Sequence, residues 1–126
     1  MKIFTKIIAL LSLMLLCSGV FAQKCNLQIT DANNGGYQSY AYVVALFDFN
    51  VSTTIPIEVQ SGTQQWPSSG SIITIYFNTN FTPDKTNLYF RAYARNTSNN
   101  RSDQEWSNVF DSAEYYAGIL IKLNIP

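Results

Sequence analysis

The side chains that most often carry enzymatic chemistry are scarce in this sequence. The chain has no histidine, and its cysteines are Cys17 and Cys25. Serine and cysteine nucleophiles usually need a histidine base, and zinc sites draw on histidine, cysteine and carboxylate ligands. Four carboxylates cluster late in the chain, among Asn and Ser residues typical of a solvated loop: Asp103, Glu105, Asp111 and Glu114. We therefore expect no catalytic residue, no bound metal and no cofactor.

Tyrosine and arginine side chains are the best candidates for binding. Tyr89, Arg91, Tyr93 and Arg95 alternate with apolar residues, so all four project from one face of a strand. Tyr and Arg are enriched in binding surfaces, and this stripe predicts a place where a sugar ring or a protein surface is recognised. The same pattern also arises when Arg packs over Tyr on an ordinary outer face of a sheet.

Three loop aromatics form a second candidate binding patch. Tyr37, Tyr40 and Trp66 stand near Asn-, Gly- and Ser-rich segments. Amphipathic aromatic rings of this kind can enter the interface of a membrane. The alternative is that they cap the end of the hydrophobic core.

The rest of the chain is typical of an all-β protein. Short runs rich in Val, Ile, Thr, Tyr and Phe are separated by turn-forming clusters, which predicts about seven strands and no helix. The expected strands are 24–30, 40–49, 55–60, 72–77, 87–95, 106–110 and 116–125. The run 40–49 is apolar on both faces, as in a covered strand. Pro56 and Lys122 are candidates for protecting exposed sheet edges. We expect a single antiparallel β-sandwich of about seven or eight strands.

Several of these segments resemble the C2 domain, a β-sandwich known for calcium-dependent binding of phospholipids. Leu27-Gln28-Ile29-Thr30 resembles its first strand, and 36–43 stands where the family has Gly-x-Ser-Asp-Pro-Tyr-Val. Trp66 ahead of the 72–77 strand, followed by 88–94, is similar to its Trp-containing turn and a later strand. The resemblance implies a C2-like sandwich, with an immunoglobulin-like sandwich as the alternative.

The calcium ligands of that family are mostly replaced in this sequence. Tyr40-Ala41 stands at the Asp-Pro position, and Ala94 and Asn96 stand where paired aspartates would end the later strand. Only Asp31 and Asp103 are acidic near the corresponding loops. Because calcium takes six to eight oxygen ligands, several of them carboxylates, the resemblance implies a calcium-independent member.

The first 22 residues have the pattern of a secretory signal peptide. Lys2 and Lys6 precede an apolar run, 7–17, that is too short to span a bilayer. Small residues then place the expected cleavage between Ala22 and Gln23. We expect residues 23–126 to be a secreted domain, extracellular or, in a Gram-negative bacterium, periplasmic.

The charge and the remaining cysteine limit the partners of that domain. Without Lys2 and Lys6, six basic residues stand against eight acidic ones, a net charge of −2, which argues against nucleic acid. Cys25 is in phase with the apolar residues of its strand. It is expected to be buried, the alternative being an intermolecular disulfide. Asn-x-Ser/Thr triplets begin at Asn50, Asn80, Asn96 and Asn100, and they are glycosylation candidates in a eukaryotic secretory pathway.

Taken together, these patterns predict a secreted, non-catalytic binding module that recognises a membrane, a glycan or a protein surface. The alternative is a structural protein that assembles on or outside the cell, because the apolar 40–49 run is suited to pairing between chains.

Overall fold

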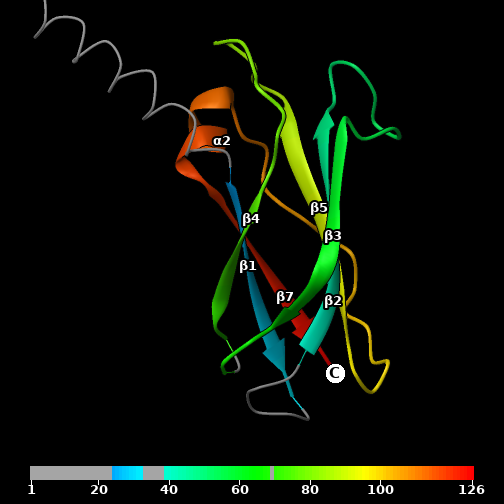
Figure 1. The fold of residues 1–126 in the computed structure, drawn as a ribbon. Coiled ribbons are helices and arrows are strands. Elements are labelled where there is room, and N and C mark those ends of the chain that lie inside the picture. The colour runs from blue at the N-terminus through cyan, green and yellow to red at the C-terminus, as the bar shows by residue number, and fades with distance from the viewer. Residues whose placement is uncertain (1–23, 33–38, 69) are drawn as a thin grey trace, which may run out of the picture.

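The protein folds as two β-sheets packed face to face and, within the described part of the chain, a short helix lies at one end of the sandwich (Figure 1). The computed structural model describes residues 24–32, 39–68 and 70–126. The expected signal peptide with its Ala22–Gln23 cleavage site and Tyr37 lie outside the described residues. No helix in the described part of the chain is long and apolar enough to cross a membrane.

One sheet has three strands and the other has four. The three-stranded sheet has the order β4-β1-β7, made of β4 (Ile72–Tyr76), β1 (Lys24–Asp31) and β7 (Ile119–Ile125). The four-stranded sheet has the order β3-β2-β5-β6, made of β3 (Glu58–Gln65), β2 (Ser39–Asp48), β5 (Leu88–Asn96) and β6 (Glu105–Trp106). These seven strands confirm the predicted β-sandwich class.

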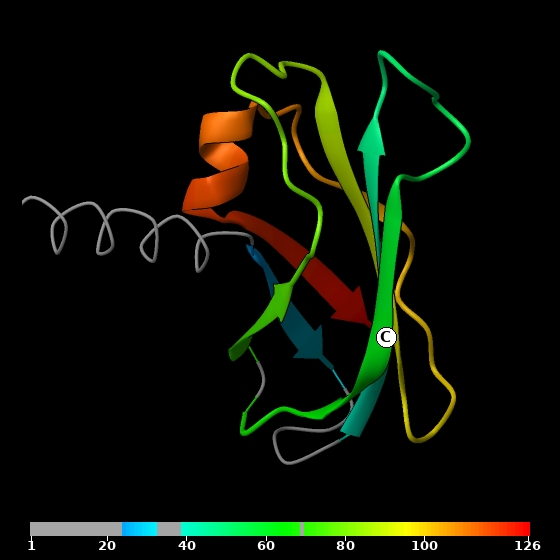
Figure 2. The same cartoon turned by 45° about the horizontal axis from the view of Figure 1, so that its top comes forward.

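The pairing of the first and last strands departs from the expected antiparallel pattern. β1 runs parallel to β7, with Cys25 opposite Ile119 and Asp31 opposite Ile125, and all other strand pairs are antiparallel. Figure 2 shows β1 and β7 side by side in the layer that faces the four-stranded sheet. Side chains alternate with the same period in both kinds of pairing, so the sequence pattern could not distinguish them.

The core lies between the sheets and is built from alternating residues of the strands. In β1 the inward residues are Cys25, Leu27 and Ile29, each at most 1% exposed, so Cys25 is buried as predicted. Because the Cys25 side chain is fully covered, its thiol has no access to a second chain, and this fold does not support the alternative of an intermolecular disulfide. The inward residues of β5 and β7 are also buried: Leu88, Phe90, Ala92, Ala94, Ile121, Leu123 and Ile125.

A short helix, α2 (Ser112–Ala117), replaces the start of the last predicted strand. The Asp111 side chain accepts the backbone N–H of Glu114 at 2.8 Å, and Gly118 ends the helix with a φ of 103°. Tyr115 is fully buried, which anchors the helix to the core. The expectation that the chain has no helix was therefore wrong, because six residues are too few to show a helical period.

Two of the predicted strands have different bounds in the structure, and both predicted edge residues lie at or before edge strands. β3 begins at Glu58 and runs to Gln65, later than the predicted 55–60 segment, and Pro56 precedes it. β3 and β7 are both edge strands, so Pro56 precedes an edge strand and Lys122 lies in one. The 106–110 segment is a strand only at β6, and Phe110 forms a single bridge with Leu88.

Candidate functional site

The outer surface of the four-stranded sheet gathers most of the aromatic and arginine side chains that are not in the core. Tyr89, Arg91, Tyr93 and Arg95 project from β5 on this side, as the alternation predicted. Their partners across the strand pair in β2 are Phe47, Ala45, Val43 and Ala41. Trp106 of β6 lies opposite Arg91. We call this surface the arginine–aromatic face, and it consists of Phe47, Phe49, Tyr89, Arg91, Tyr93, Arg95, Arg101 and Trp106.

Four aromatic rings pack together at one end of this face. The Phe49 and Tyr89 rings are stacked with centroids 4.2 Å apart, and the Trp106 ring lies 5.2 Å from Phe47 and 5.5 Å from Phe49. Phe47 is 0% exposed although it points away from the main core. Phe47 and Phe49 lie in the 40–49 run that was predicted to be covered on both faces, and Trp106 was not among the predicted binding residues. The cluster is therefore a second, smaller apolar core on the outside of the sheet.

The arginines of the face lie over aromatic rings. The Arg91 guanidinium carbon is 5.1 Å from the centroid of Phe47 and 5.2 Å from that of Trp106. The Arg101 guanidinium lies 4.3 Å above the Tyr93 ring. Arg101 comes from the polar loop after β5 and was missed by the sequence reasoning. Stacking occupies the flat side of a guanidinium, while its N–H donors radiate in the plane and can still bind an oxyanion.

Two of the three loop aromatics are buried in the core. Tyr40 is 2% exposed and Trp66 is 1% exposed, and their rings meet edge to face with centroids 5.2 Å apart. The Trp66 Nε1 group donates to the carbonyl of Ser71 at 2.8 Å. Hence Tyr40 and Trp66 do not form the exposed patch that was one of the two expectations, because their rings close the end of the sandwich.

A buried carboxylate links the two sheets beside these rings. Asp31 of β1 is 4% exposed, and its Oδ2 atom accepts hydrogen bonds from the Tyr40 hydroxyl at 3.2 Å and from the Asn96 Nδ2 atom at 3.0 Å. Burial, together with the neighbouring Asp31 carboxylate, raises the pKa of Tyr40 to about 12. The network joins β1 to β2 and β5, so we assign these polar groups to the fold rather than to a ligand.

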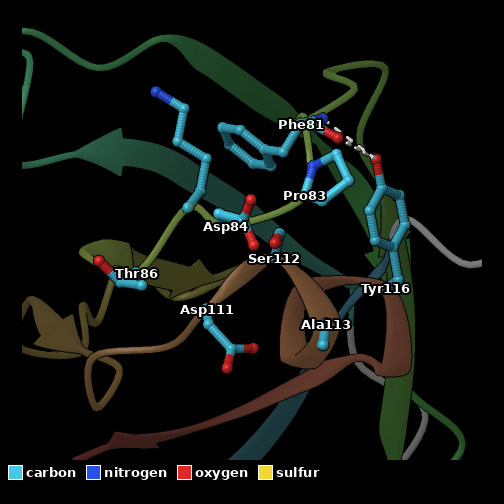
Figure 3. A pocket seen from close by; sticks show the side chains of 9 residues that line it. Phe81, Pro83, Asp84, Thr86, Asp111, Ser112, Ala113 and Tyr116 are labelled. Carbon is cyan, nitrogen blue, oxygen red and sulfur yellow. Dashed lines mark hydrogen bonds between the residues drawn. The ribbon is translucent and has the colours of Figure 1, made fainter.

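A pocket of about 470 Å³ lies beside α2. Figure 3 shows the Tyr116 hydroxyl directed at the backbone of Phe81, with which it forms two 3.1 Å hydrogen bonds. Asp111 caps α2, and the Lys85 amino group is paired with Asp48 at 3.0 Å. Tyr116, Asp111 and Lys85 of the lining are thus engaged by the protein itself. Nowhere in the described part of the chain do three or more potential metal ligands come together.

Comparisons of the chain with protein-family models, with curated proteins and with solved structures found no match. Among the described residues, the arginine–aromatic face is the surface whose side chains are least explained by the fold.

Proposed function

We propose that the protein is an exported, non-catalytic binding module that recognises glycans through its arginine–aromatic face. The observation that carries the proposal is the pair of stacked guanidinium groups, Arg91 on Phe47 and Trp106 and Arg101 on Tyr93. Rings that hold arginines in place reduce the entropy lost when a ligand binds, and the free N–H donors suit the oxygen atoms of a sugar. Export rests on the signal-peptide pattern of the first 22 residues.

A glycan suits this surface better than a membrane does. Tyr40 and Trp66, the loop aromatics proposed for insertion into lipid, are buried, and the rings of the face lie packed on a sheet. Such a surface presents polar donors beside rings that pack on one another, including Trp106, which is 43% exposed but lies against Phe47 and Phe49. The same reasoning leaves lipid binding as an outcome that the experiment tests.

We also propose that the fold is a calcium-independent relative of the C2 sandwich. Two packed sheets agree with this idea, and the positions that carry aspartates in that family support the loss of calcium. Ala94 is 0% exposed, and Asn96 is 5% exposed and bonded to Asp31. Neither side chain carries a carboxylate for a bound ion.

The test is binding of the purified protein to a panel of polysaccharides by affinity electrophoresis, with liposome sedimentation in the presence and absence of calcium. Replacing Tyr93 with Ala removes the ring under Arg101, and we expect the affinity to fall by about tenfold, or 1.4 kcal/mol. Tyr76→Ala is the matched control, because Tyr76 is 64% exposed on the other sheet. Binding that survives Tyr93→Ala and Tyr89→Ala, or that occurs only with liposomes, would contradict the proposal.

A second candidate is self-assembly through β3. This edge strand has eight residues, and Glu58 is its one charged residue, so it lacks the Lys, Pro or shortness that usually protect sheet edges. The run 40–49, which first suggested assembly, forms the interior strand β2 and is paired on both sides. Light scattering coupled to size exclusion tests the idea: a monomer at every concentration would reject it, and a dimer that Ser61→Lys dissociates would support it.

A further inference from the structure

A small depression lies on the arginine–aromatic face over Ala41, near the start of β2. Ala41 is exposed on the interior strand β2, where it is opposite Thr63 of β3 on one side and Arg95 of β5 on the other. The small side chain between two longer ones leaves a hollow of about 160 Å³. It is lined by Ser39, Ala41, Thr63, Arg95, Asn96 and Thr97.

Two arginines are backbone partners beside this depression: Arg95 lines it, and the Arg101 guanidinium lies over the Tyr93 ring. Arg95 and Arg101 form an isolated antiparallel bridge, so their side chains project from the same side of the sheet. Both are exposed, and like charges directly opposite one another destabilise a sheet. Between the residues that the structure describes, the one ion pair is Lys85–Asp48, so neither guanidinium group is in an ion pair, and Asp103 lines a separate hollow with Arg101. An oxyanion bound between them would remove the repulsion.

We propose that this depression binds the acidic groups, carboxylate or sulfate, of a negatively charged polysaccharide. The idea rests on the proposed glycan-binding function and names its ligand class. Arg95 contacts the oxyanion from the wall of the depression through two parallel N–H donors, and Arg101, its backbone partner, adds a second positive charge beside it. The hydroxyl groups of Ser39 and Thr63 contact the hydroxyl groups of the sugar.

A polymer fits this surface better than a free ion does. Arg91 and Arg95 are four residues apart on one strand, which places them about 13 Å apart along β5. A polysaccharide that lies along β5 therefore meets Arg91, whose guanidinium lies over Phe47 and Trp106, after it has met Arg95. Two acidic groups on one chain bind with a higher effective concentration than two separate ions, so weak contacts at exposed arginines add up.

The test compares the purified protein's affinity for two matched pairs of probes: dextran sulfate against neutral dextran, and polygalacturonate against its methyl ester. We expect binding to the charged member of at least one pair, weakened by added salt. Arg95→Gln and Arg101→Gln should each reduce this affinity by about tenfold. Lys122→Gln is the control, because it removes the same charge from an exposed position on the other sheet and should change the affinity by less than about twofold.

A second variant fills the depression without changing any charge. Ala41→Leu should also weaken binding of the acidic probe, while circular dichroism and thermal unfolding establish that the variants are folded. Equal binding of charged and neutral probes, or acidic binding that tolerates all three substitutions, would overturn the inference and leave the glycan-binding function standing. No binding to any polysaccharide would overturn both. Stronger arginine-dependent binding to single-stranded DNA or anionic liposomes would overturn the ligand class.

Discussion

We expect the replacement of Glu58 by Ala to cost the protein a substantial part of its stability. Glu58 begins β3 in one sheet, and its carboxylate accepts hydrogen bonds from the segment that follows β4 in the other sheet. The donors are the backbone N–H of Asn78 at 3.0 Å to both oxygens, the Thr79 N–H at 2.7 Å and the Thr79 hydroxyl at 2.6 Å. The Gln60 side-chain amide donates a further bond at 2.7 Å. This carboxylate thus links the two sheets at β3 and the segment after β4.

The size of the effect follows from these contacts. A hydrogen bond to a charged group contributes about 1.5–3 kcal/mol, and water replaces part of that at a half-buried site. Four donors to one carboxylate therefore predict a loss of about 2–4 kcal/mol for Glu58→Ala. Glu58→Gln should lose about half as much, because the amide keeps one carbonyl acceptor but turns N–H groups toward other donors. For a domain of this size a loss of 3 kcal/mol lowers the Tm by about 10–15 °C.

The effect should also depend on pH. Burial of the Glu58 carboxyl by itself raises its pKa, but the hydrogen bonds from Thr79, Gln60 and Asn78 outweigh that and lower the pKa below its usual value. A carboxyl with a lowered native pKa stabilises the fold fully above its unfolded pKa, about 4.3, and loses this contribution as the pH falls through the native value. The stability difference between wild type and Glu58→Gln should stay constant from pH 7 to 5 and shrink below about pH 4.3.

Urea unfolding at several pH values measures this, with the fluorescence of buried Trp66 as one probe. Glu114→Gln is the control, because it removes an exposed carboxylate on α2 and should change the free energy of unfolding by no more than about 0.5 kcal/mol. A change as small as that for Glu58→Ala at pH 7 would refute the reasoning, as would a difference between wild type and Glu58→Gln that persists unchanged to pH 3.

Three further predictions follow from burial. Phe47→Ala should cost about 3 kcal/mol in urea unfolding, because Phe47 is fully buried against Trp106; an effect below about 0.5 kcal/mol would mean that the outer cluster does not form. Burial also raises the pKa of the Cys25 thiol, so in a chain produced without residues 1–22 it should react with Ellman's reagent only after denaturation, and rapid native labelling would contradict its position. After expression in a eukaryotic secretory host, mass spectrometry should find glycan on exposed Asn80 and none on Asn96, which is 5% exposed; a glycan on Asn96 in folded protein would contradict this.

Alternation along the chain was enough to predict the core faces of the long strands but not how the strands pair. The inward residues of β1 and β5 follow the period of two without exception, so their burial could be read from the sequence. The parallel pairing of β1 with β7 left no local trace. The helix α2 was not predicted because Tyr115 and Tyr116 are aromatic residues directly before β7, so they resemble the beginning of that strand. Its caps, Asp111 with Glu114 and then Gly118, were the available signal.

Only the residues that β5 contributes to the candidate site could be predicted from the sequence. The four-residue stripe of β5 faces outward as expected, because its alternation is clear. Phe47 could not be placed, since β2 is apolar on both faces and the pattern does not say which face meets the core. Arg101 and Trp106 come from polar segments without a period. Their positions over Tyr93 and Phe47 depend on how the chain returns along β5.

The net charge does not indicate the arginine–aromatic face, because several carboxylates are engaged inside the protein while the arginines gather on this one surface. Asp31, Asp48 and Glu58 are all engaged inside the protein, by hydrogen bonds from Tyr40 and Asn96, by Lys85 and by the segment after β4. The three arginines of the chain lie together on the arginine–aromatic face, and residues 23–126, to which they belong, carry a net charge of −2. A negative domain does not attract an acidic ligand from a distance, so recognition has to come from contact at the arginines themselves. Binding should therefore depend on the positions of single guanidinium groups, which is why exchanging Arg95 for glutamine should matter and exchanging Lys122 should not.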